Sequence, residues 1–225
     1  MESVTRAALA SISYTNIDYR ETLRKVILDR LVVASDPQIE FTALAIKGWI
    51  GPDLAQLNDF ETFFDLVVHS NKSIQTAALS SLKQRMPERE YQESLERANI
   101  VFILRSLSSN IDNPEAISFV AFALPTMALT LAHNNHVDVV LQLLACEEPQ
   151  IREGASTAIE CIANGSVNDR KHLLDMDILE RLIGNEVPLG QTELQLSFTI
   201  IPKLSLDYLR AGKADFILGL VEWVF

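Results

Sequence analysis

The sequence predicts an all-α protein built from stacked helical units, and three observations support this prediction. Apolar residues recur at spacings of three and four, as in Leu23, Val26, Ile27 and Leu31, which is the period of one helix face. No long stretch alternates between apolar and polar residues, as a half-buried strand would. Similar polar breaks separate the apolar stretches about every 40 residues, and a period in this range indicates stacked supersecondary units.

Each polar break joins the end of one predicted helix to the start of the next. The breaks lie near residues 36–39, 71–74, 113–116, 148–151 and 188–192. Short polar side chains cap a helix by accepting hydrogen bonds from its free backbone N–H groups, and the expected caps are Asp36, Asn71 and Asn113. Pro37, Pro114 and Pro149 fit the first helical turn, where no N–H is needed.

A second, longer period runs through the same pattern and indicates that a unit of two repeats occurs twice. At one constant separation Ile74 matches Ile151, and Pro125 matches Pro202. Both prolines fall within predicted helices, where a proline costs about 3 kcal/mol. Each therefore predicts either a kink that changes the curvature of the stack or a helix that starts or ends there.

Residues 137–183 resemble an armadillo repeat, with an apolar second helix, an acidic break containing Pro149, and a third helix rich in small residues. Gly165, Ser166, Asn168 and Arg170 stand where the family has its closing turn. The related HEAT repeats remain an alternative. The resemblance implies a right-handed α-α superhelix of about five repeats, which forms a single domain over residues 1–225. Its third helices would line a concave groove for peptides or partner proteins.

Small residues are expected where each third helix crosses its neighbours closely. They are Ala43, Ala78, Ala121 and Ala155. A larger side chain at such a crossing would overpack the stack at a cost of about 1–3 kcal/mol.

The resemblance places partner-binding residues on the outward side of the third helices, within one residue of register. They are Phe41, Ala45 and Trp49; Thr76, Ser80 and Gln84; and Glu153, Thr157 and Glu160. The best-known peptide binders of the family carry Trp and Asn four residues apart on this helix, whereas Thr157 and Cys161 occupy those positions here. A nuclear-import receptor for basic signals is therefore disfavoured.

The charge balance narrows the class of partner. Nineteen basic against thirty acidic residues give a net charge of −11, which disfavours binding to nucleic acid and to anionic lipid. A basic peptide or protein surface is favoured instead, and Glu153 and Glu160 would attract it. The longest apolar run, residues 117–132, is too short to span a bilayer. With no targeting segment and two free thiols, Cys146 and Cys161, an intracellular protein, cytoplasmic or nuclear, is expected.

Motifs for catalysis are missing from the sequence. The sequence contains no phosphate-binding glycine loop, no dinucleotide-binding fingerprint and no nucleophile elbow. His133, His136 and Asp138 have a spacing that a metal would permit, but their surroundings are typical of a polar turn before a helix. No catalytic residue, metal or cofactor is therefore predicted.

The sequence thus favours a non-enzymatic module that holds a partner protein or peptide. A chaperone, assembly factor or nucleotide-exchange factor of armadillo type is the alternative, and a repeat-built lyase or hydroxylase is disfavoured. The apolar C-terminal end is either the last core helix or a surface that packs against a partner or self-associates. Its candidate residues are Phe216, Leu220, Trp223 and Val224.

Overall fold

The computed structural model describes residues 60–109, 112–183 and 191–218. Every regular element in these ranges is a helix, which confirms the predicted all-α class. The chain divides into two compact units, Met1–Arg85 and Met86–Phe225. The expectation of one continuous domain over residues 1–225 stays a prediction.

In the first unit, the structure describes α5 (Phe60–Val67) and α6 (Lys72–Arg85), which pack against each other. The Asn71 side chain accepts hydrogen bonds from the backbone N–H groups of Ser73 (3.0 Å) and Ile74 (3.3 Å). The predicted cap of this third helix is therefore confirmed. Ala78, expected at a close crossing, is fully buried.

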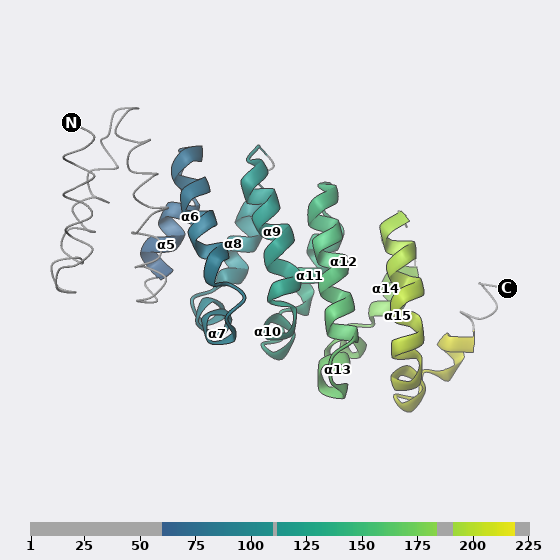
Figure 1. Ribbon diagram of the computed structural model, residues 1–225. Coiled ribbons are helices and arrows are strands. Elements are labelled where there is room, and N and C mark those ends of the chain that lie inside the picture. Colours follow the sequence, from purple (N-terminus) through teal and green to yellow (C-terminus); the bar gives the residue numbers. More distant parts are fainter. Residues whose placement is uncertain (1–59, 110–111, 184–190, 219–225) are drawn as a thin grey trace, which may run out of the picture. The chain divides into compact units, whose positions relative to one another are not determined.

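In the second unit, the described helices form three consecutive triplets (Figure 1). The first comprises α7 (Arg89–Arg97), α8 (Ile100–Ser108) and α9 (Pro114–Thr126). The second comprises α10 (Ala128–His133), α11 (Val137–Leu144) and α12 (Pro149–Ala163). The third comprises α13 (Val167–Asp175), α14 (Ile178–Ile183) and α15 (Gln191–Arg210). The third helices α9, α12 and α15 pack side by side, and the first helices α7, α10 and α13 form a second row.

The helix starts reproduce both periods of the sequence. The third helices α6, α9, α12 and α15 begin at positions 72, 114, 149 and 191, so a shorter interval lies between two equal longer ones. Helices α5, α6 and α9 are each separated from their counterparts α11, α12 and α15 by the same length of chain. Two successive repeats therefore form the longer unit.

The polar breaks act largely as predicted. The Asn113 side chain accepts a hydrogen bond from the N–H of Glu115 (3.0 Å), and Pro114 and Pro149 lie in the first turns of α9 and α12. The cap of α12 is Glu148, which was not among the predicted caps. The first break, with Asp36 and Pro37, and most of the fifth lie outside the described residues.

The turns between first and second helices share a feature that the sequence pattern did not reveal. Asn99, Asn135 and Asp177 all adopt the left-handed conformation, with φ of 68°, 61° and 50°. Asn and Asp tolerate this conformation better than other residues with a side chain, because their short polar groups form local hydrogen bonds. One such residue at each of these turns lets the chain reverse direction at the same point of every triplet.

Helices α9 and α12 approach so closely that one of them needs a glycine. A Cβ atom at Gly154 would lie 2.5 Å from the carbonyl oxygen of Ala121. Ala121 thus marks the predicted crossing from the α9 side, and Ala155 is fully buried beside it. Gly154 itself was not predicted, and Ala43 lies outside the described residues.

Pro125 and Pro202, which match at the longer period, lie at different points of their helices. Pro125 lies in the last turn of α9, which ends at Thr126, so it marks a helix end. Pro202 lies inside α15, and the helix continues to Arg210. A helix start or end at Pro202 is therefore wrong, because the packed side of α15 holds its backbone in one helix through this point.

Polar contacts join the first and third helices of the third triplet next to the turn that carries the armadillo resemblance. Arg170 pairs with Asp207 of α15 (2.6 Å) and donates to the carbonyl oxygen of Gly165 (2.8 Å). Ser166 and Asp169 form a reciprocal capping box at the start of α13. Three of the four turn residues singled out in the sequence thus take part in the turn, whereas Asn168 is exposed.

Candidate functional site

The outer sides of α9, α12 and α15 form one continuous surface of the second unit, which we call the third-helix face. Counting from the helix starts gives each position on α12 a counterpart on α9 and on α15. The face, which continues past the end of α12 to its cap Asn164 and past the end of α9 to Leu129 of α10, comprises Ser118, Phe122, Pro125 and Leu129; Glu153, Thr157, Glu160 and Asn164; and Gln195, Thr199, Pro202 and Leu206. All twelve are exposed or half-buried.

The structure places the predicted groove residues of α12 on this face. Glu153 and Thr157 are exposed and Glu160 is half-buried, and the Thr157 hydroxyl donates to the backbone carbonyl of Glu153 (2.9 Å). In the first unit, Thr76 and Ser80 are half-buried and Gln84 is exposed on α6. Phe41, Ala45 and Trp49 lie outside the described residues. The binding role of all nine stays a prediction.

The third-helix face changes in chemistry from one helix to the next, which was not predicted from the sequence. Beside α9 it presents Pro125 and Leu129, and on α15 it presents Pro202 and Leu206 at the same register. Between them, α12 presents Glu160 and Asn164. The leucines are accessible, because Leu129 is 43% exposed and Leu206 is 54% exposed. Two apolar patches therefore flank an acidic and polar helix.

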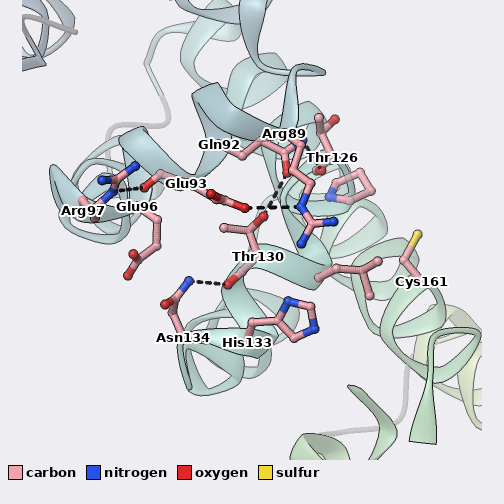
Figure 2. Close-up of a pocket in the computed structure, with 12 residues that line it drawn as sticks. Arg89, Gln92, Glu93, Glu96, Arg97, Thr126, Thr130, His133, Asn134 and Cys161 are labelled. Atoms are coloured by element: carbon pink, nitrogen blue, oxygen red, sulfur yellow. Dashed lines mark hydrogen bonds and ion pairs between the residues drawn. The ribbon is translucent and has the colours of Figure 1, made fainter. Parts of the chain in front are cut away.

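A cavity of about 630 Å³ opens at one edge of this face, where the ends of α9 and α12 meet α7 and α10 (Figure 2). Its apolar lining comes from Pro125, Leu129 and Cys161. Its polar lining comes from Arg89, Gln92, Glu93, Glu96, Arg97, Thr126, Thr130, His133 and Asn134. Arg89 and Glu93 form an exposed ion pair (3.2 Å) at this site. The cavity was not predicted, because its walls are brought together only by stacking.

One glutamine fixes the polar wall of the cavity. The Gln92 side-chain nitrogen donates to the backbone carbonyls of Met86 (2.9 Å) and Thr126 (3.0 Å). Its oxygen accepts the hydroxyl hydrogen bond of Thr130 (2.9 Å). Gln92 thus connects α7 to both α9 and α10, and its amide group serves to hold these helices in position.

The histidines that could have faced one metal have separate partners. His133 pairs with Asp169 of α13 (2.6 Å), and His136 pairs with Glu96 of α7 (3.2 Å). Asp138 pairs with Arg105 of α8 (2.9 Å). In the part of the chain that the structure describes, no cluster of three or more histidine, cysteine or acidic side chains could hold a metal ion.

Cys161 lies beside the cavity, but its chemistry is that of an inert thiol. Burial raises the pKa of Cys161, the nearby Glu160 carboxylate raises it further, and Lys203 of α15 only partly opposes them. A cysteine acts as a nucleophile through its thiolate, so this thiol is not activated at neutral pH. Cys146 and Cys161 are both free, as predicted.

The predicted terminal interface is described at one residue only. Phe216 is half-buried, and its ring centroid lies 5.8 Å from that of Tyr208 on α15. Leu220, Trp223 and Val224 lie outside the described residues, so self-association stays a prediction. Among the described helices, none combines the length and apolarity needed to cross a membrane.

Comparison with known proteins gives matches to structures alone, since no family model and no curated protein matches the sequence. A designed armadillo repeat protein in complex with the peptide (KR)4 has a TM-score of 0.56 at 15% identity, over 88% of this chain and 90% of that chain. A second designed armadillo repeat protein has a TM-score of 0.54 at 13% identity, over 80% and 81%. Computationally designed armadillo repeat proteins for modular peptide recognition give 0.51 at 16% identity, over 87% and 90%. The armadillo-like solenoid fold expected from residues 137–183 is therefore confirmed.

Proposed function

We propose that this armadillo-like chain is a non-enzymatic binding module that holds a basic partner protein or peptide on its third-helix face. The observation that carries the proposal is the exposed row of third helices, with Glu153 and Glu160 at its centre. Such a row is long and shallow because each repeat contacts only its neighbours, which suits an extended segment. The complex of one designed armadillo neighbour with (KR)4 supports the same choice of ligand.

The mode of binding proposed here relies on charged and apolar side chains rather than on a Trp–Asn pair repeated along the third helices. Thr157 and Cys161 occupy the positions for which the resemblance implies Trp and Asn. At the register of Thr157, α9 carries Phe122 and α15 carries Thr199. Because no Trp–Asn pair recurs along these helices, charge and apolar contacts are left to select the partner.

The proposal also includes the cellular compartment and the class of partner. Two free thiols, Cys146 and Cys161, support a reducing, intracellular compartment. The net charge of −11 supports a protein partner over nucleic acid or anionic lipid.

Reversing both central carboxylates tests the proposal. In Glu153→Lys/Glu160→Lys, two attractions become repulsions. Since an exposed ion pair contributes about 0–1 kcal/mol, the combined change should weaken binding about tenfold. The measurement is the Kd for fluorescently labelled (KR)4, obtained by fluorescence anisotropy.

The matched control is Glu90→Lys/Glu147→Lys, which changes the net charge equally at exposed positions away from the third-helix face. We expect its Kd to stay within about twofold of the wild type, because salt screens charges that lie far from the bound peptide. Equal weakening by both double variants would show that net charge alone attracts the peptide. The assignment of the site to α12 would then be wrong.

A further inference from the structure

We infer that the third-helix face selects an extended segment with a basic residue at its centre and an apolar residue three positions away on either side. This inference rests on the proposed function and names the partner's chemistry. It follows from the alternation of the face: Pro125 and Leu129, then Glu160 with Glu153, then Pro202 and Leu206.

The two outer positions are apolar and accessible. Leu129 is 43% exposed and Leu206 is 54% exposed, and a proline lies one turn before each. On α15 the apolar strip continues through Phe198, which is 59% exposed. Burying such side chains under a partner releases their apolar surface from water, which favours binding in proportion to the area covered.

The central position is acidic. Glu153 and Glu160 both lie on the outer side of α12, one exposed and one half-buried. Glu160 lies at the register of Pro125 and Pro202, so it is the carboxylate that a basic side chain at the centre of the segment would meet. Glu153 lies two turns earlier on α12 and adds to the negative charge of the same helix.

The spacing of the partner follows from helix packing. Axes of packed helices lie about 8–10 Å apart, and a segment in the extended polyproline II conformation advances about 3.1 Å per residue, with every third side chain on the same side. Such a segment therefore moves about three residues from one third helix to the next, and its side chains at these positions all face the protein. Its two apolar side chains stand about twice that distance apart, and the pattern is the same in either chain direction.

The two apolar positions differ in depth. Beside Pro125 and Leu129 the cavity of about 630 Å³, which Cys161 of α12 also lines, has room for a whole side chain. Beside Pro202 and Leu206, the partner's second apolar side chain would lie along an open strip that ends at Phe198. The segment is thereby anchored at one end and aligned at the other.

Synthetic peptides of equal composition test the spacing. The patterned peptide has one arginine, a leucine at the third position to each side and serine elsewhere, whereas the compact peptide has both leucines next to the arginine. We expect the patterned peptide to bind the full chain about tenfold more tightly in fluorescence anisotropy. Leu129→Ser and Leu206→Ser should each remove most of that advantage while leaving (KR)4 binding within about twofold.

Phe102→Ser is the matched control, since Phe102 is 62% exposed on α8, away from the third-helix face. It should leave both peptides unaffected, and circular dichroism of each variant verifies folding. If (KR)4 binds but the patterned and compact peptides bind equally, the pattern is overturned while the basic-partner proposal stands. If neither (KR)4 nor the patterned peptide binds the wild-type chain, the proposed function fails and this inference fails with it.

Discussion

At the scale of single residues, Gly154 determines how closely α9 and α12 pack. Its missing side chain admits the backbone of Ala121, and the atoms that a methyl group would meet are a carbonyl oxygen at 2.5 Å and a Cα at 2.7 Å. Backbone atoms inside a helix cannot rotate away as a flexible side chain can. Any larger residue at this position therefore has to move one helix relative to the other.

The substitution Gly154→Ala tests this close approach. Alanine is the better helix former by about 1 kcal/mol, so without the clash the change would stabilise the helix. We expect a net loss of about 1–3 kcal/mol in the free energy of unfolding instead, because the overpacked interface must open. Urea denaturation followed by circular dichroism gives the value.

Thr157→Ala, an exposed change on the same helix, serves as the reference and should stay within about 0.5 kcal/mol of the wild type. A Gly154→Ala protein as stable as this reference, or more stable, would contradict the proposed constraint.

At the scale of elements, Asp169 secures the start of α13 and its contact with α10. The residue is 4% exposed, accepts the N–H of Ser166 (2.6 Å) and pairs with His133 (2.6 Å). Burial by itself would raise the pKa of Asp169, but the hydrogen bonds from Ser166 and His133 outweigh it and hold the pKa below its usual value. The carboxylate therefore stabilises the folded chain only while it is ionised.

The pH dependence of Asp169→Asn follows from the lowered pKa of Asp169 in the folded chain. A carboxyl whose pKa is lower in the folded state stabilises fully above its unfolded pKa, about 3.9, and loses this effect as the pH falls through the folded value. The wild type should exceed Asp169→Asn by about 1–2 kcal/mol from pH 5 to 7, which is the size of a capping contribution.

This difference should shrink below about pH 4, where the unfolded chain takes up the proton before the folded chain does, and it should be lost as the folded carboxylate is protonated at lower pH. Urea unfolding of both proteins at several pH values measures it. A difference that stays constant down to pH 3, or grows, would show that the charge on Asp169 does not stabilise α13.

Local chemistry made most of the helix boundaries predictable. Asn71 and Asn113 are caps and Pro114 and Pro149 open helices, because each effect involves only neighbours along the chain. Gly154 was not predicted, since a glycine within a helix acquires its role only when Ala121 of another helix lies against it. Features that depend on stacking are not encoded in any short window.

The same distinction applies to the candidate site. Glu153, Thr157 and Glu160 were expected on an outer helix side from the family resemblance, and the structure leaves Glu153 and Thr157 exposed and Glu160 half-buried. The cavity was not predicted, because Arg89 and Cys161 are distant in the chain and meet only through packed elements. The alternation of the face depends on the register between repeats of unequal length, which is defined only once the helix starts are known.

At the scale of the whole molecule, the excess of acidic residues acts over longer distances than any single contact. A net charge of −11 surrounds the chain with a negative potential that attracts basic segments before they dock. Salt weakens this attraction, because the screening length falls from about 10 Å at 0.1 M to about 3 Å at 1 M.

We therefore expect the Kd for (KR)4 to rise several-fold between about 0.1 and 1 M NaCl, mainly through slower association. Stopped-flow fluorescence separates the association and dissociation rates. The Glu153→Lys/Glu160→Lys variant should show a smaller salt dependence than the wild type. An affinity that does not change with salt would contradict an electrostatic role for the acidic surface.

The alternation of longer and shorter repeats has a consequence for how such a chain can be lengthened or shortened. Removing the middle repeat of the second unit (α10–α12) would bring Pro125 next to Pro202, and it would remove both the acidic surface of α12 and Leu129. Copying a block of two successive repeats would instead preserve the order of apolar and charged surfaces along the third helices. For this protein the unit to copy is thus the pair of repeats, because only the pair contains both the longer and the shorter interval.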